Sequence, residues 1–136
     1  ASSCNEWNMP LLAEMMPGGF DPSFHSPENI TLASRVGAEL GADIIKTTYT
    51  GDPASFQELT DGVFAPVVVL GGSRKESDDE LLAMVKESLD AGASGVAVGR
   101  NVWQHPDVRG IVSALSRLIH DDASVDEALG ELRQPA

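Results

Sequence analysis

The chain has 136 residues, of which 21 are acidic and 9 are basic, so its formal net charge at neutral pH is −12. This length suits one domain, and a hydrophobic content of 42% excludes the disordered class of proteins. The acidic balance also argues against nucleic acid as a partner, because binding to a phosphate backbone needs clustered lysine and arginine. A single small anion can still bind where one or two basic side chains meet.

The cysteine content and the apolar runs indicate a cellular compartment. Cys4 is the single cysteine, so no disulfide forms within the chain, and this usage fits a reducing cytoplasm. The longest apolar runs fall far short of the ~20 residues that cross a bilayer. The first residues show no basic region followed by an apolar one, the pattern of a signal peptide. We therefore expect a cytoplasmic protein with no membrane partner.

Periodicity and capping residues predict two strand–helix units in the first half of the chain. Ser26 and Asp52 are typical helix caps, and a proline follows each at the first helical position. Gly41 ends the first of these helices. The predicted elements are a strand over 9–16, a loop over 17–26, a helix over 27–40, a strand over 44–48 and a helix over 53–61.

The second half predicts two further strand–helix units. The stretch "APVVVL" at 65–70 is a continuous apolar run without alternation, which is typical of a strand of a parallel sheet buried on both faces. Ser77 caps the helix that follows. The predicted elements are a strand over 65–70, a helix over 78–89, a strand over 95–98, a helix over 106–120 and a short helix over 124–132.

Four successive βα units predict an α/β fold with a parallel sheet. A doubly wound sheet would carry a glycine-rich phosphate loop after its first strand, and neither that fingerprint nor a Walker A sequence is present. A (β/α)₈ barrel has its site at the carboxyl ends of the strands, which suits the turns found here. The difficulty for the barrel is length, because a barrel needs about 250 residues and this chain supplies four of the eight βα units.

Glycine-rich turns follow the last two predicted strands. Gly71, Gly72 and Ser73 follow one strand, and Gly99 and Arg100 follow the next. Glycine lets the backbone approach an anion closely, and arginine adds a charged, forked donor. In a (β/α)₈ barrel the phosphate site often lies after strands seven and eight, beside a short extra helix. We therefore predict that these five residues bind phosphate; ordinary strand–helix turns with an exposed Arg100 are the alternative.

Lys46 lies toward the carboxyl end of the second predicted strand, in the stretch "GADIIKTTYTGD". A desolvated lysine loses part of its preference for the charged form, and its free amine can attack a carbonyl to form a Schiff base. The alternative is a lysine that extends into solvent. Side chains alternate along a strand, so we expect Lys46 and Thr48 to share one face. The three histidines are scattered without the spacing of metal ligands, and we predict no metal site and no cofactor.

Four segments carry a resemblance to a known family. The chain resembles the C-terminal half of the class I aldolase family, which includes archaeal-type fructose-bisphosphate aldolase, aminodideoxyheptulosonate synthase and a thiolase that acts on a phosphorylated signal. The resemblance covers almost the whole chain from Met9 onward. The segments are "GADIIKT-Y", "APVVVLGGSRK", "AGASGVAVGRNVWQHPD" and "ALSRLIHDDASVDEAL".

The resemblance implies strands five to eight of a (β/α)₈ barrel, so we expect residues 1–136 to be a C-terminal half-barrel of four βα units plus a C-terminal short helix. It implies a Schiff-base lysine at Lys46 and a substrate phosphate at Gly71, Gly72, Gly99 and Arg100. The family's aldolases usually carry a proton-transferring tyrosine in a Tyr-Pro-Arg-Gly stretch at the end of strand five. Here the matching residues are Met16-Pro17-Gly18-Gly19, so that tyrosine is missing. The strand-one aspartate of the family lies outside this half.

The sequence thus predicts a class I lyase that cleaves a carbon–carbon bond in a phosphorylated ketone or aldehyde, in carbohydrate metabolism. The alternatives are thiolase-like acyl transfer on a phosphorylated diketone and a non-catalytic phosphate-binding half-barrel. Four parallel strands leave two open edges, which are prone to aggregation. We therefore expect either an N-terminal half-barrel partner or self-association, and a homo-oligomer overall.

Overall fold

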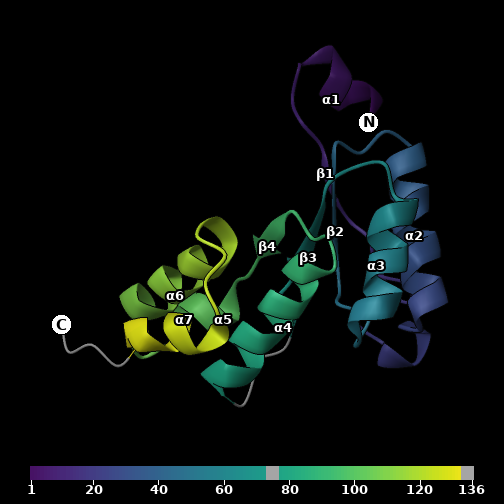
Figure 1. The fold of residues 1–136 in the computed structure, drawn as a ribbon. Coiled ribbons are helices and arrows are strands. Elements are labelled where there is room, and N and C mark those ends of the chain that lie inside the picture. Colours follow the sequence, from purple (N-terminus) through teal and green to yellow (C-terminus); the bar gives the residue numbers. More distant parts are fainter. Residues whose placement is uncertain (73–76, 133–136) are drawn as a thin grey trace.

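The computed structural model describes residues 1–72 and 77–132 of the chain. Its centre is a parallel sheet of four strands in the order β1-β2-β3-β4, so each strand pairs with the next one along the chain (Figure 1). The predicted α/β class and parallel sheet are confirmed. The strands are β1 (Leu12–Glu14), β2 (Ile44–Thr47), β3 (Val67–Leu70) and β4 (Gly95–Ala97).

Eight helical segments flank or connect the strands in the described residues. They are α1 (Ser2–Glu6), the 3-10 helix η1 (Pro22–Phe24), α2 (Pro27–Glu39), α3 (Pro53–Gly62), α4 (Asp78–Asp90), α5 (Arg100–Trp103), α6 (Val108–His120) and α7 (Val125–Leu132). Sequence analysis missed α1, η1 and α5. The predicted strand over 9–16 was too long: Pro10 has no N–H to donate and Pro17 closes the other end, so β1 keeps three residues.

Side-chain caps fix the starts of the main helices. The Ser26, Asp52 and Ser77 side chains accept hydrogen bonds from the backbone N–H three residues further on, as predicted. Asp107, not the residue before Pro106, caps α6, so that helix begins two residues later than expected. Such caps contribute about 1 kcal/mol each to helix stability.

The helices cover one face of the sheet and form the core there. Ile45 and Thr47 of β2 are fully buried on this face, whereas their neighbours Ile44 and Lys46 are only partly buried on the other. One apolar cluster joins β1–β3 to α2 and α3, and a second joins α4, α6 and α7. Val68 of β3 is also only partly buried, so the expected burial of this strand on both faces is incomplete.

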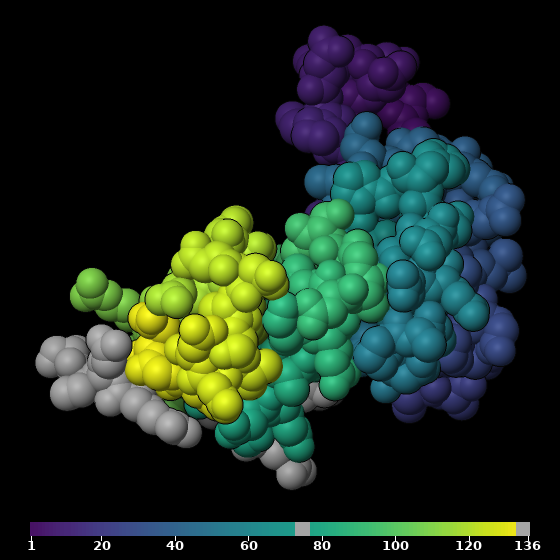
Figure 2. All heavy atoms as spheres, viewed as in Figure 1, coloured from purple at the N-terminus to yellow at the C-terminus, as the bar shows by residue number. Residues whose placement is uncertain are grey.

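Figure 1 and Figure 2 show the main helices in two groups. Helices α2 and α3 form one block beside the sheet, and α4, α6 and α7 form another, while the first residues project from the upper end. No residue of α1 is buried.

Among the residues with a described structure, no helix has the length and apolar character needed to span a membrane.

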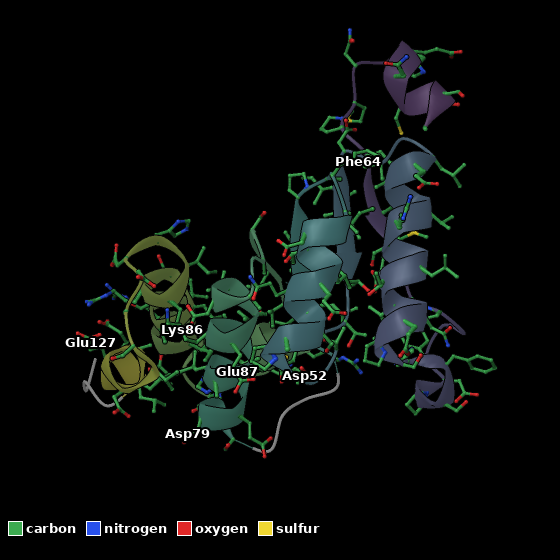
Figure 3. The ribbon with its side chains drawn as sticks, turned by 45° about the vertical axis from the view of Figure 1, so that its right-hand side comes forward. Asp52, Phe64, Asp79, Lys86, Glu87 and Glu127 are labelled. Carbon is green, nitrogen blue, oxygen red and sulfur yellow. The ribbon has the colours of Figure 1, made fainter. Side chains whose placement is uncertain are left out.

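Phe56 tests the importance of this core. Its side chain on α3 is fully buried, whereas Phe64, in the loop after α3, is 75% exposed (Figure 3). Phe56→Ala should lower the free energy of unfolding by about 3–5 kcal/mol, because it removes buried area and leaves a cavity. Phe64→Ala is the matched control and should change it by less than about 0.5 kcal/mol. Chemical denaturation of both variants measures the difference; equal effects would contradict this core.

Candidate active site

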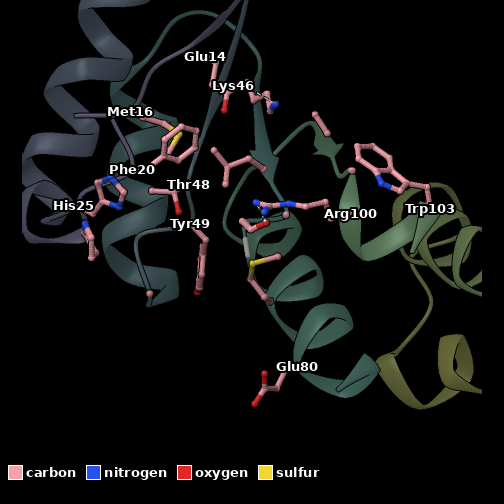
Figure 4. A pocket seen from close by; sticks show the side chains of 18 residues that line it. Glu14, Met16, Phe20, His25, Lys46, Thr48, Tyr49, Glu80, Arg100 and Trp103 are labelled. Atoms are coloured by element: carbon pink, nitrogen blue, oxygen red, sulfur yellow. Dashed lines mark hydrogen bonds and ion pairs between the residues drawn. The ribbon is translucent and has the colours of Figure 1, made fainter. Parts of the chain in front are cut away.

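A cavity of about 980 Å³ lies on the face of the sheet that the helices leave open, at the carboxyl ends of the strands (Figure 4). Alternate strand residues form its floor, which is why Lys46 and Thr48 both line it while Thr47 does not. The predicted shared face of Lys46 and Thr48 is confirmed. The cavity is lined by Glu14, Met16, Phe20, Pro22, His25, Lys46, Thr48, Tyr49, Gly51, Leu70, Gly71, Gly72, Glu80, Met84, Ala97, Gly99, Arg100 and Trp103.

Lys46 is paired with a carboxylate at the floor of this cavity. Its Nζ donates to Glu14 Oε2 at 2.8 Å, and the two residues are register partners on β1 and β2. The Lys46 side chain is 22% exposed, so it does not extend into bulk solvent. Sequence analysis missed Glu14. The available signal was a single acid in the otherwise apolar stretch "LLAEMM".

The register around Lys46 is held from the opposite face of the same strand. Thr47 Oγ1 donates to the Met15 carbonyl at 2.8 Å, and the Met15 N–H donates to the Lys46 carbonyl at 2.8 Å. Thr47 is fully buried, which makes its hydroxyl dependent on that acceptor. These two bonds lock β1 to β2 at the position where Glu14 meets Lys46.

The structure brings the two predicted glycine turns together at one side of the cavity. Asn101 Nδ2 donates to the Gly71 carbonyl at 3.0 Å, and Arg100 Nη2 donates to the Gly72 carbonyl at 3.4 Å. Ser73, the remaining predicted phosphate ligand, lies outside the described residues. Asn101 is 6% exposed, so the contact that joins the two turns is buried.

Close packing explains why glycine occupies this junction. A Cβ on Gly71 would lie 2.7 Å from Val98 Cγ1 and 3.1 Å from Asn101 Nδ2. Gly72 has a φ of +63°, a region that side chains other than glycine rarely adopt. Arg100 starts the short helix α5, with Val98 and Gly99 between it and β4, and Figure 4 shows its side chain extending into the cavity. The predicted turn at Gly99 and Arg100 is therefore the start of the short helix α5.

Aromatic and sulfur-containing side chains complete the walls. Met84 of α4 lines the cavity and also packs against the first apolar cluster. Trp103 lines the cavity as well, and its side chain is 66% exposed. A ring nitrogen of His25 lies 2.9 Å from the Gly19 carbonyl. Within residues 1–72 and 77–132, no group of three or more His, Cys, Asp or Glu side chains is arranged to hold a metal ion.

Tyr49 connects the loop after β2 to helix α4. Its ring packs against Phe56 with centroids 5.3 Å apart, and its hydroxyl donates to Glu87 Oε2 at 3.0 Å. Burial raises the pKa of the Tyr49 phenol, and the acceptor Glu87 and the charge of Asp52 raise it further (both acids are labelled in Figure 3). The neutral phenol is therefore the form that the fold favours.

The raised pKa of Tyr49 predicts a pH dependence of stability. The folded chain holds the phenol proton more tightly than the unfolded chain, so the stabilisation is complete below about pH 10 and is lost as the pH rises above that value. Tyr49→Phe should cost about 1 kcal/mol at neutral pH through the lost hydrogen bond. The difference between wild type and variant, measured by denaturation at several pH values, should shrink in alkali. A constant difference would contradict the assignment.

The chain is similar in sequence to proteins with known names. Residues 1–105 match the DeoC/LacD family of aldolases. The chain is 42% identical over 139 residues to a 2-amino-4,5-dihydroxy-6-oxo-7-(phosphonooxy)heptanoate synthase of Streptomyces griseus, covering 100% of this chain and 48% of the relative. It is 43% identical over 107 residues to a class 1 fructose-bisphosphate aldolase of Halobacterium salinarum, covering 79% of this chain and 41% of the relative.

Solved structures agree with this relationship. An archaeal fructose 1,6-bisphosphate aldolase superposes with a TM-score of 0.82 at 36% identity, over 88% of this chain and 48% of that chain. A Schiff-base-forming fructose-1,6-bisphosphate aldolase superposes with the same TM-score at 37% identity. These neighbours are TIM-barrel aldolases, and this chain spans about half the length of the curated relatives that it matches. The chain belongs to the DeoC/LacD aldolase family.

Proposed function

We propose that this chain supplies the Schiff-base half of a class I aldolase that acts on a phosphorylated ketone or aldehyde. The observation that carries the proposal is the position of the Lys46 amine, on the floor of a cavity bordered by the two joined glycine turns. The family match and the named relatives support aldolase chemistry over thiolase-like acyl transfer or binding alone.

The chemistry follows from an amine placed beside a carbonyl. The Lys46 nitrogen would attack the carbonyl carbon, the carbonyl oxygen would leave as water, and a protonated imine would remain. When the hydroxyl on the β carbon loses its proton, the bond between the α and β carbons breaks and its electron pair moves toward the imine, which gives an enamine and releases an aldehyde. A proton then adds to the α carbon of the enamine, and hydrolysis of the resulting imine releases the ketone and returns the amine. The reverse sequence forms the bond.

We infer that Gly71, Gly72, Ser73, Gly99 and Arg100 bind the substrate phosphate. Two observations support this: the turns carrying these residues meet at one side of the cavity, and the Arg100 guanidinium reaches into it (Figure 4). The 3.4 Å bond from Arg100 to the Gly72 carbonyl is long, so a phosphate oxygen would compete well for this donor. The Streptomyces griseus relative is named for a compound that carries a phosphonooxy group.

We also propose that residues 1–136 are strands five to eight of a barrel that an N-terminal half completes. Among the residues that the structure describes, β1 and β4 each pair on one side only, and the named relatives have about twice the matched length. Leu12 is 44% exposed on the open face of the sheet, where strands of a closed barrel would meet it. A homo-oligomeric state and a cytoplasmic location remain predictions from the sequence.

The lysine assignment predicts a covalent adduct. With a completed barrel and dihydroxyacetone phosphate as the probe, borohydride should reduce the imine and attach the probe to Lys46. Peptide mass mapping locates the adduct. Lys46→Met should abolish it while leaving the fold intact, because methionine keeps most of the length without the amine. An adduct on Lys86, or undiminished turnover in Lys46→Met, would exclude the Schiff base at Lys46.

The phosphate assignment predicts a selective loss of affinity. Arg100→Ala should weaken binding of dihydroxyacetone phosphate by about 1.5–3 kcal/mol, the range for a hydrogen bond to a charged group. Affinity for dihydroxyacetone, which lacks the phosphate, should not change. Arg109→Ala, an exposed arginine outside the cavity, is the matched control. Isothermal titration measures both ligands; equal losses for both would contradict a phosphate contact.

The half-barrel assignment predicts a partner. Residues 1–136 produced alone should bind an apolar dye at the open face, or should associate through the free edges of β1 and β4. Addition of the N-terminal half should abolish dye binding and give one complex by light scattering. A monomer that binds no dye would contradict the assignment, whereas a stable complex of two identical chains would favour self-association.

A further inference from the structure

We propose that Glu14 is the general acid and base that forms and resolves the Schiff base on Lys46. This inference rests on the proposed function, since it concerns proton transfer at the same amine. Its starting point is the 2.8 Å contact between Glu14 Oε2 and Lys46 Nζ inside the cavity. Figure 4 shows the two side chains turned toward each other on neighbouring strands.

Imine formation needs a group that moves protons at the nitrogen and at the carbonyl oxygen. An ammonium cannot attack until it loses a proton, and the carbonyl oxygen cannot leave until it gains two. A carboxylate at hydrogen-bond distance can accept the first proton and return it to the oxygen. Glu14 is placed to do both because it borders the same cavity as the amine.

The other ionisable groups that line the cavity are engaged elsewhere or are remote. A His25 ring nitrogen contacts the Gly19 carbonyl, and the Tyr49 hydroxyl donates to Glu87. Glu80 lies on the first turn of α4, and Figure 4 shows it at the opposite end of the cavity from Lys46. Arg100 has donors only. In the part of the chain that the structure describes, Glu14 is therefore the ionisable cavity residue that contacts the Lys46 amine.

The proton balance closes with Glu14 alone. The carboxylate takes a proton from the ammonium, and the amine then bonds to the carbonyl carbon. Glu14 gives that proton to the resulting oxyanion and takes a second one from the nitrogen. It then gives this second proton to the hydroxyl, which leaves as water while the nitrogen forms the imine. Glu14 ends as the carboxylate with which it began.

A purely structural ion pair would behave differently. The Glu14 side chain is 44% exposed and that of Lys46 is 22% exposed. Ion pairs at such exposure contribute little to stability. Removal of the carboxylate should therefore leave the fold unchanged while it slows proton transfer, which separates the two roles.

The test uses the completed barrel with dihydroxyacetone phosphate in excess borohydride, and it measures the rate at which the Lys46 adduct forms. Glu14→Gln should slow this rate about 10²–10⁴-fold, the usual contribution of a general acid–base group. Glu39→Gln is the matched control: this carboxylate pairs with Arg35 on α2, away from the cavity, and its loss should not change the rate.

Chemical rescue keeps the proposal falsifiable if the amide disturbs folding. Formate should accelerate adduct formation in Glu14→Ala in proportion to its concentration, because it can enter the space left by the carboxylate. A Glu14→Gln rate within about threefold of wild type, far below the general acid–base range, would overturn the proposal. So would a slow Glu14→Ala that formate does not rescue. If wild type forms no adduct at Lys46, the proposed function itself fails.

Discussion

The parallel pairing of β1 with β2 is the constraint on which the rest of the site depends. It sets Glu14 opposite Lys46 and Ala13 opposite Ile45. Because side chains alternate, a shift of one residue would turn Lys46 into the helix-covered core and Ile45 into the cavity. The buried Thr47 hydroxyl, bonded to the Met15 carbonyl, opposes that shift from the other face of the strand. The position of the Lys46 amine in the cavity therefore follows from a register fixed by the core.

Parallel strands also direct all of their carboxyl ends to one edge. The turns after β3 and β4 meet there because the two strands are register neighbours, with Leu70 opposite Ala97. Asn101 closes this junction through the Gly71 carbonyl, and the absence of a side chain at Gly71 lets the turns approach. Arg100 is thereby held on the same side of the sheet as Lys46. This arrangement places the Lys46 amine and the proposed phosphate-binding turns on one side of the sheet, as a substrate with both a carbonyl and a phosphate would require.

Local signals predicted the elements well. The caps Ser26, Asp52 and Ser77 lie where the helices begin, and the β-branched run "VVVL" is a strand. The floor residue Lys46 and both glycine turns were also visible, since Lys46 lies near the carboxyl end of a predicted strand and each turn follows a predicted strand. The length of β1 was less predictable, because an apolar run does not show how far an edge strand finds hydrogen-bond partners.

The contacts that complete the site were not predictable from local pattern. Glu14 and Lys46 are 32 residues apart, and Asn101 and Gly71 are 30 apart, so each contact exists only after strand pairing sets the register. Glu14 looked like one more solvated acid in a chain of net charge −12. The helix α5 was missed for another reason: four residues are too few to show a helical period.

The most direct test of this account is a crystal structure of the completed barrel after borohydride reduction with dihydroxyacetone phosphate. The account predicts continuous density from Lys46 Nζ to the former carbonyl carbon. It also predicts the phosphate between the Gly71–Gly72 turn and Arg100, and the Glu14 carboxylate within hydrogen-bond distance of the new secondary amine. A ligand bound without a covalent bond to Lys46, or a phosphate held away from the two turns, would contradict the account.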